Sequence, residues 1–222
     1  AKNVKNGNIG NYPVGAEKEV EIDGKSYTVR VANNTTPEEC KRTDFSQTAC
    51  GFVVEFADIV ENKQMNSSST NVGGWKDSAM RTYANNDFYN KLPEELRNVI
   101  KSTKVVSGHG STTGETNFTT TDNIYLLSAH EVWKNNFKRD AAYDQTRQLD
   151  YYAGKGVTTS ENYSYAIKKD INGNASSCWL RAACSSYDND FLIVGVGLHG
   201  NDQWDNYLAI NVFGFAPAFR IG

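Results

Sequence analysis

Histidine is the side chain that most often supplies acid–base catalysis or a metal ligand, and the chain has three. His130 is followed by Glu131, as at the start of the zinc-protease helix, but Lys134 stands where that helix needs a second histidine. His109 lies in a Gly- and Ser-rich stretch with no cysteine or carboxylate beside it. We therefore assign no metal or catalytic role to these two residues or to His199.

The other signatures of catalysis are also missing from the sequence. Residues 107–110 (Ser-Gly-His-Gly) are not a nucleophile elbow, which needs a glycine on both sides of a serine that follows a strand. The sequence contains no glycine-rich motif of the kind that binds phosphate groups. It thus predicts no catalytic residue, no metal, no cofactor and no enzyme activity.

Oxygen ligands that calcium prefers are plentiful near the C-terminus, where aspartates and asparagines lie close together. They are Asp188, Asn189, Asp190, Asn201, Asp202, Asp205 and Asn206. Their spacing does not match the twelve-residue calcium loop between two helices. We interpret them as acids and amides of solvated loops.

The four cysteines, Cys40, Cys50, Cys178 and Cys184, leave the redox state open. No two of them form a CxxC pair, which argues against a zinc ribbon or a thioredoxin-type site. The pairs Cys40–Cys50 and Cys178–Cys184 would form local disulfides in an oxidising compartment. A chain of 222 residues is also large enough to keep its cysteines as buried thiols.

Composition favours a recognition protein. Aromatic residues make up 12% of the chain and include 12 Tyr, which gives a large contact area at low entropic cost. The formal charge of -3 argues against a nucleic-acid partner, which a basic surface would bind. No apolar stretch is long enough to span a membrane, so we also expect no membrane insertion.

Short strands and two helices have to position the binding residues. Alternating apolar residues predict a hairpin over 18–32 around Asp23-Gly24, and an apolar run predicts a strand over 51–60. Helical spacing predicts helices over 76–89 and 93–101, followed by a long polar loop over 107–122. Further strands are expected over 178–183, 191–197, 207–212 and 215–221. The sequence therefore predicts a single α+β domain over residues 1–222.

An ordered set of motifs identifies a family resemblance that extends from about Tyr12 to Ile221. The motifs are Gly73-Gly74-Trp75, Ser78 to Arg81, Leu92 to Leu96, Asp122 to Ser128, Glu131-Val132, Trp179-Leu180-Arg181 and Gly214 to Phe219. The chain resembles an uncharacterised domain of surface proteins of gut bacteria and their phages. That domain looks like a member of the C-type-lectin-like group, and some members are variable proteins of diversity-generating retroelements. The resemblance implies a C-type-lectin-like fold with short strands, two central helices and long loops.

The retroelement mechanism implied by this resemblance randomises adenines, mostly at Asn codons near the C-terminus. Changing the first two bases of those codons cannot create Lys, Glu, Gln, Met or Trp. These five types occur 38 times, but only Gln203 and Trp204 fall within residues 181–222, where the density elsewhere would give about eight. Buried C-terminal strands are also poor in Lys and Glu, which gives the depletion a second explanation.

We expect the ligand-binding surface in two polar turns of this C-terminal segment. The candidate residues are Ser185, Tyr187, Asp188, Asn189, Asp190, His199, Asn201, Asp202, Trp204, Asn206 and Tyr207. Aromatic side chains are typical anchors of such surfaces, and residues 182–213 contain four Asp but no Lys or Arg. The ligand is expected to be a protein or a surface polymer with basic groups, and the location to be extracellular, on a phage virion or a bacterial cell surface.

Two alternatives share the fold that the resemblance implies. Calcium-dependent sugar lectins typically carry Glu-Pro-Asn or Gln-Pro-Asp with Trp-Asn-Asp, and this chain has only Trp204-Asp205-Asn206. Formylglycine-generating oxidases need a pair of reactive cysteines, and Cys178 and Cys184 stand in a different context. Fold alone does not decide between these functions.

Overall fold

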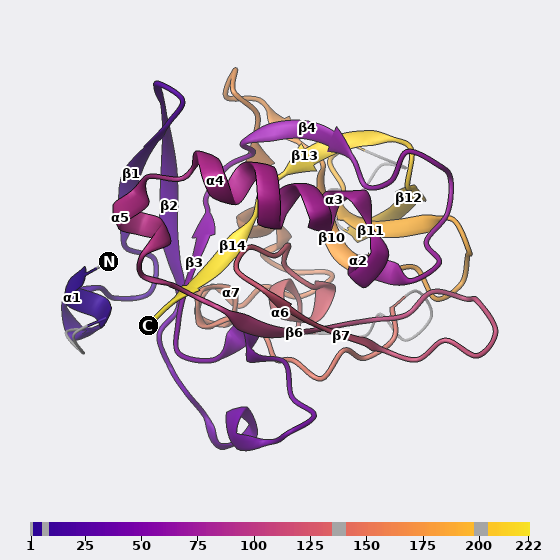
Figure 1. Cartoon of the computed structure of the whole chain (residues 1–222), viewed down its shortest axis with the longest axis horizontal. Helices are drawn as coiled ribbons and strands as arrows, with labels where there is room; N and C mark the ends of the chain where they lie inside the picture. Colours follow the sequence, from indigo (N-terminus) through magenta and orange to yellow (C-terminus); the bar gives the residue numbers. More distant parts are fainter. Residues whose placement is uncertain (1, 6–8, 135–140, 198–203) are drawn as a thin grey trace.

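Two five-stranded sheets form the frame of the protein (Figure 1). The computed structural model describes residues 2–5, 9–134, 141–197 and 204–222. The first sheet is antiparallel throughout and has the order β1-β2-β3-β14-β5. Its strands are β1 (Glu17–Ile22), β2 (Lys25–Asn33), β3 (Phe52–Phe56), β14 (Ala218–Ile221) and β5 (Ile100–Lys101).

The second sheet has the order β12-β11-β10-β13-β4 and carries most of the C-terminal segment. Its strands are β12 (Trp204–Leu208), β11 (Asp190–Val194), β10 (Cys178–Ala183), β13 (Val212–Phe215) and β4 (Glu61–Gln64). Only β10 and β13 pair in parallel. Residues 216–217 join β13 directly to β14, so one short segment belongs to both sheets.

The hairpin predicted around Asp23-Gly24 is confirmed. β1 and β2 pair without interruption from the pair Glu17–Arg30 to the pair Ile22–Lys25. Both turn residues have positive φ, 52° and 75°, as the two-residue turns favoured in hairpins require. Two smaller sheets accompany the frame. They pair β6 (Thr103–Ser107) with β7 (Phe118–Asp122) and β8 (Lys168–Lys169) with β9 (Ala175–Ser176).

The predicted α+β fold class with two central helices is wrong, because the protein is mostly β. The α-helices are α1 (Lys2–Lys5), α2 (Gly74–Asp77), α3 (Ala79–Tyr83), α4 (Tyr89–Lys91), α5 (Glu94–Arg97), α6 (Ala129–Val132) and α7 (Asp150–Gly154). A π-helical turn, η4 (Ala84–Phe88), joins α3 to α4. The 3₁₀ turns are η1 (Ile9–Asn11), η2 (Glu38–Lys41), η3 (Gln47–Ala49) and η5 (Tyr163–Ala166). The C-type-lectin-like architecture is therefore not the architecture of this chain.

Local chemistry explains where the predicted helices break or stop. The segment predicted over 76–89 is helical from Gly74 to Asp77 and again, through the π-helical turn, from Ala79 to Lys91. Ser78 has extended backbone angles and its side chain accepts a hydrogen bond from the Arg81 amide, so it ends α2 and caps α3. The helix predicted over 93–101 stops after one turn, since Ile100 and Lys101 pair with β14 instead. The predicted loop over 107–122 is also corrected, because its last five residues form β7. Strand pairing has outweighed local helical spacing.

The helical segment from α3 to α4 covers the junction of the two sheets. The Phe88 ring lies 5.6 Å from Phe56 of the first sheet and 5.0 Å from Phe215 of the second. One apolar cluster of buried side chains extends from Val4 to Ile221. Of the residues in the family motifs, Trp75, Trp179, Arg181 and Phe219 are buried, whereas Arg81 and Leu96 are half-buried. Across the residues described, every helix is too short or too polar to cross a lipid bilayer.

Cysteine pairing, open from the sequence, is resolved by the structure. Cys40 and Cys50 form a disulfide with their Cα atoms 5.9 Å apart, and it closes the segment that contains η2 and η3. Cys178, on β10, and Cys184, just after it, are buried and lie outside any disulfide. The first local pair is therefore confirmed and the second is not formed.

Removing the disulfide is expected to lower the free energy of unfolding by about 2–3 kcal/mol, because its ten-residue separation restricts the unfolded chain. The measurement is urea denaturation of the native protein with and without a reductant. The double variant Cys40→Ala/Cys50→Ala serves as the control, since reductant should leave its unfolding curve unchanged. Equal stability of the oxidised and reduced native protein would contradict the expectation.

Candidate ligand-binding surface

A single asparagine from a distant loop holds the turn between β10 and β11. The Asn71 side-chain amide donates hydrogen bonds to the carbonyl oxygens of Tyr187 and Asp190, each at 2.8 Å, and of Cys184 at 3.2 Å. The Asn71 backbone amide donates a fourth, at 2.9 Å, to the carbonyl of Asp188. Asn71 itself is fully buried. All four bonds reach main-chain atoms, so this anchoring does not depend on the side chains of the turn.

The middle of the turn is its most exposed part. Tyr187 is 54% exposed, Asp188 is exposed and Asn189 is half-buried. None of these three side chains makes a hydrogen bond to a residue that the structure describes. The Cys184 amide donates to the Asp190 carbonyl, and the Ala209 amide donates to the Asn189 carbonyl. The turn is thus attached through its main chain, and it presents the exposed side chains of Tyr187 and Asp188 to solvent.

Asp190 begins β11 and differs from its neighbours because it is buried. Its Oδ2 atom accepts a hydrogen bond of 2.6 Å from the Asn206 side-chain amide of β12. Its Oδ1 atom is buried and has no hydrogen-bond partner in the described part of the chain. Burial raises the pKa of Asp190; the Asn206 hydrogen bond opposes this shift, whereas the charges of Asp205 and Asp188 reinforce it. Asp190 therefore supports the site from below. The prediction that it is an exposed contact is wrong.

β12 is an edge strand of the second sheet. As in any β-strand, its successive side chains point to opposite faces of the sheet. Asn206 lies opposite Leu192 and Tyr207 lies opposite Phe191. The Tyr207 ring packs edge-to-face against Phe213 at 5.2 Å, and Phe213 packs against the buried Trp179 at 5.1 Å. Tyr207 is half-buried in this aromatic stack, and it lies on the opposite face of β12 from Asn206.

Exposed aliphatic side chains surround the turn. Val72 follows Asn71, while Leu208, Ile210 and Val212 come from the end of β12 and the start of β13. The link between β12 and β13 is joined to the turn by the hydrogen bond from the Ala209 amide to the Asn189 carbonyl. Hydrogen bonds from the Met65 amide to the Ala209 carbonyl and from the Gln64 side chain to the Ile210 carbonyl join the same link to the end of β4. We call these exposed side chains, together with Tyr187, Asp188 and the half-buried Asn189, the turn surface. Its members are Val72, Tyr187, Asp188, Asn189, Leu208, Ile210 and Val212.

The structure thus brings together only part of the predicted site. Tyr187, Asp188 and Asn189 belong to the turn surface, and Ser185 is half-buried beside them. Trp204 pairs with Val194 at the end of β11 that lies away from the turn. His199, Asn201 and Asp202 lie outside the described residues, as does the side chain of Trp204.

Sequence reasoning missed Asn71 and the aliphatic members of the turn surface. Nothing in the sequence near Asn71 links it to a turn more than a hundred residues later. Leu208, Ile210 and Val212 alternate in sequence and therefore resembled the buried face of a strand. In the structure these three side chains are 38%, 37% and 59% exposed, which the sequence pattern does not show.

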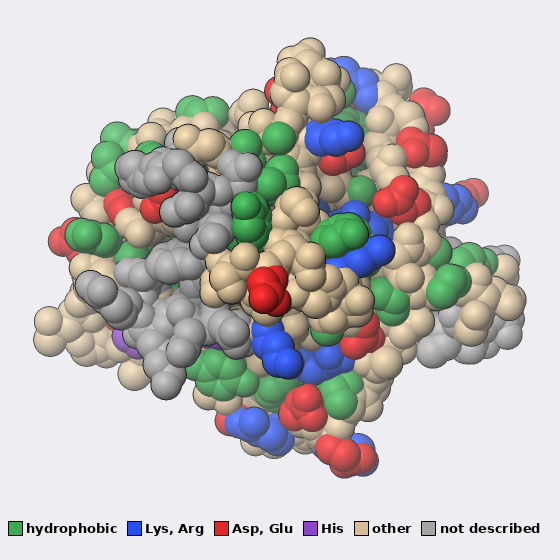
Figure 2. Space-filling model, turned by 180° about the vertical axis from the view of Figure 1, so that it is seen from behind, with side chains coloured by type: hydrophobic (Ala, Val, Ile, Leu, Met, Phe, Trp, Pro, Cys, Tyr) green, Lys and Arg blue, Asp and Glu red, His purple; other side chains and the backbone are tan. Residues whose placement is uncertain are grey.

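The electrostatics of the turn surface are acidic. Asp188 and Asp205 lie near Asp190, and residues 182–213 contain no Lys or Arg. On the face shown in Figure 2, by contrast, Lys and Arg side chains lie among Asp and Glu side chains, and neither sign dominates. Within the described ranges no three His, Cys, Asp or Glu side chains are placed to bind one metal ion.

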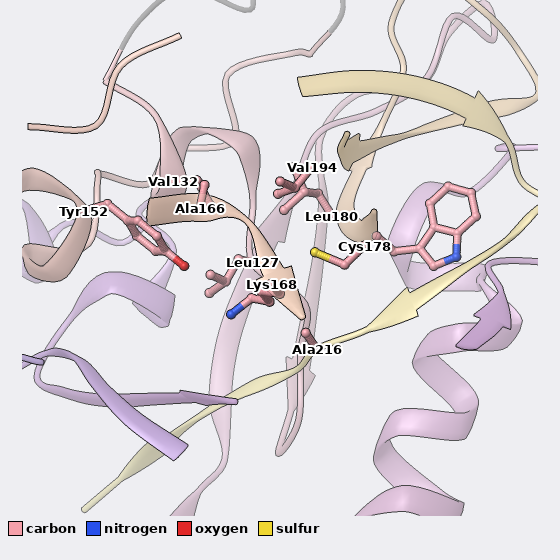
Figure 3. A pocket seen from close by; sticks show the side chains of 10 residues that line it. Leu127, Val132, Tyr152, Ala166, Lys168, Cys178, Leu180, Val194 and Ala216 are labelled. Atoms are coloured by element: carbon pink, nitrogen blue, oxygen red, sulfur yellow. The ribbon is translucent and has the colours of Figure 1, made fainter. Parts of the chain in front are cut away.

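A small cavity beside the thiol of Cys178 is another place where a reactive group lies in the core. Cys178 and Lys168 line a cavity of about 10 Å³ among apolar side chains (Figure 3). That volume holds about one water molecule. Burial raises the pKa of Cys178 to about 11, so its thiol stays protonated near neutral pH. The cavity and its thiol are therefore part of the folded core.

Comparison with known proteins adds a family but no relative of known activity. No curated protein and no solved structure matches the chain. A family model described as a domain of unknown function, DUF6273, matches residues 52–222. The match begins at β3 and includes both the Asn71 loop and the whole turn surface. Because it covers more than half of the residues, the chain belongs to the DUF6273 family.

Proposed function

We propose that this protein is a ligand-binding domain displayed on a phage particle or a bacterial surface, with a sequence-variable binding surface generated by retroelement mutagenesis. The observation that carries the proposal is the attachment of the β10–β11 turn through main-chain carbonyls. A turn held in this way keeps its conformation while its side chains change. Binding sites on such rigid supports tolerate substitution.

The depletion of five residue types supports the same proposal. The exposed positions Tyr187, Asp188, Leu208, Ile210 and Val212 carry no Lys, Glu, Gln, Met or Trp, although exposed positions are where Lys and Glu are usually most common. Burial in C-terminal strands does not account for these positions. Randomised Asn codons would account for them.

The surface chemistry suits a protein or surface polymer that presents basic and apolar groups. Exposed aliphatic side chains and Tyr187 supply apolar contact area, and the nearby aspartates favour a cationic partner. The Cys40–Cys50 disulfide supports display outside the cell, since disulfides persist in oxidising compartments.

The proposal is tested by comparing how much Asn71 and the side chains of the turn each contribute to the free energy of unfolding. Asn71→Asp is expected to lower the free energy of unfolding by about 2 kcal/mol or more, because buried carbonyls lose their donors. Tyr187→Ser, Asp188→Ser and Asn189→Ser should each change it by no more than about 0.5 kcal/mol. Urea denaturation measures both. A loss above about 1 kcal/mol in the serine variants would show that the turn depends on its side chains.

Sequencing the encoding gene from many cells of one population tests diversification directly. Substitutions should concentrate in the codons of residues 185–189 and 204–212. The matched control is the exposed part of the β1–β2 hairpin, residues 17–19, 21 and 23–26, which lies outside the variable segment. Equal substitution frequencies in the hairpin and in the turn surface would reject the retroelement mechanism.

A further inference from the structure

A second concave site lies between the β1–β2 hairpin and the α4 helix, which are neighbours in Figure 1. It is a groove of about 180 Å³. Its floor is apolar and includes the buried side chains of Ile22 and Phe88, with Val60 beside them. Pockets for drug-sized ligands usually measure about 300–1,000 Å³, so the occupant of this groove has to be small.

Charged side chains of both signs line the walls of the groove. Asp23 and Lys25 come from the hairpin turn, Glu61 begins β4, and Lys91 ends α4. No ion pair joins any two of these four side chains, all of which lie in the described ranges. Two carboxylates and two ammonium groups therefore face one small space without neutralising one another.

Glu61 is held in position for binding. The Tyr83 hydroxyl donates a hydrogen bond to its Oε1 atom, and the Lys63 ammonium lies 4.0 Å from the centre of the Tyr83 ring. Tyr27 lines the groove, and its pKa is raised by burial first and then by the charges of Glu61 and Asp23. Both carboxylates therefore act on the same part of the groove wall. A carboxylate fixed in this way loses little freedom when it accepts an ammonium group.

We propose that this groove binds a free apolar α-amino acid. The ligand's ammonium group would bind Glu61 and Asp23, its carboxylate would bind Lys25 and Lys91, and its side chain would lie on the floor formed by Ile22, Val60 and Phe88. This inference is independent of the turn surface. It assigns a small-molecule site to a region that includes a hairpin outside the matched family segment.

Titration with leucine, followed by amide chemical shifts, tests the proposal on the full chain. Leucine is expected to bind with a Kd of about 1 mM or tighter and to shift the amides of residues 22–27, 60–61 and 88–91. Leucinamide lacks the carboxylate and N-acetyl-leucine lacks the ammonium group. Each should bind at least about tenfold more weakly than leucine, since each leaves one pair of charges unpaired.

Two charge variants complete the experiment. Glu61→Gln keeps an acceptor for Tyr83 but removes the charge, and Lys91→Met removes one ammonium; each should weaken leucine binding about tenfold or more. The matched controls are Glu94→Gln and Lys101→Met, which change exposed charges outside the groove and should leave the affinity unchanged. Thermal unfolding verifies that all four variants are folded. Equal affinity for leucine and its two derivatives, or shifts confined to other residues, would overturn the proposal.

Discussion

Arg181→Met is expected to lower the free energy of unfolding by about 3–5 kcal/mol, because it leaves a buried carboxylate without its cation. Arg181 and Glu131 are both fully buried. The guanidinium donates to Glu131 Oε2 at 2.6 Å and to Oε1 at 2.7 Å, and also to the carbonyl of Leu126 at 3.0 Å. Glu131 in turn completes the capping box at the start of α6.

Urea denaturation measures the loss of unfolding free energy in Arg181→Met and in the surface variant Arg42→Met, which is the control. Arg42 pairs with Asp44 at the surface, and exposed pairs contribute at most about 1 kcal/mol. Adding Glu131→Gln to Arg181→Met should cost much less than Glu131→Gln alone, since the two residues act as a unit. Additive losses, or a loss for Arg181→Met as small as that for Arg42→Met, would show that the pair does not stabilise the fold.

Glu55→Gln is expected to remove about 3 kcal/mol of stability at neutral pH and to flatten the acid dependence of unfolding. The Glu55 carboxylate is fully buried; Lys168 donates to it at 2.9 Å, Tyr152 at 2.8 Å and Arg30 at 2.9 Å. Burial raises its pKa, but the charges and hydrogen bonds of Lys168 and Arg30 outweigh burial and lower the pKa from 4.5 to about 2. Two to three pKa units correspond to about 3 kcal/mol.

The sign follows from the lowered pKa. Glu55 binds a proton more readily in the unfolded chain than in the folded one. Its contribution to the free energy of unfolding is therefore complete above about pH 4.5 and is lost as pH falls towards 2. The measurement is the difference in unfolding free energy between wild type and Glu55→Gln at pH 7, 4.5, 3 and 2.5. That difference should shrink across this window. Parallel curves for the two proteins would contradict the lowered pKa.

Local patterns predicted most strands and the helical segment over 76–89 well, and the helix over 93–101 badly. The β1–β2 hairpin was predictable because Asp23-Gly24 determines the turn and its strands alternate in sequence. Residues 93–101 carry an equally regular helical pattern, yet Ile100 and Lys101 pair with β14, a strand more than a hundred residues later. Pairing at that separation leaves no trace in the local sequence.

The same limit applies to the candidate site. Residues 185–190 are recognisable as a turn by composition, so its exposed members were predicted. Asp190 was predicted as a contact because it is acidic and adjacent to that turn, but its burial depends on Asn206 from a neighbouring strand. The role of Asn71 depends entirely on tertiary structure.

The link between β13 and β14 has a consequence for biosynthesis. β13 lies between β10 and β4, and β14 lies between β3 and β5, so residues 212–221 occupy interior positions in both sheets. Neither sheet is complete before the ribosome has translated this segment and released it from the exit tunnel. The two sheets therefore assemble only after the turn surface has been translated. Any substitution in the turn surface is already present in the chain when the sheets fold.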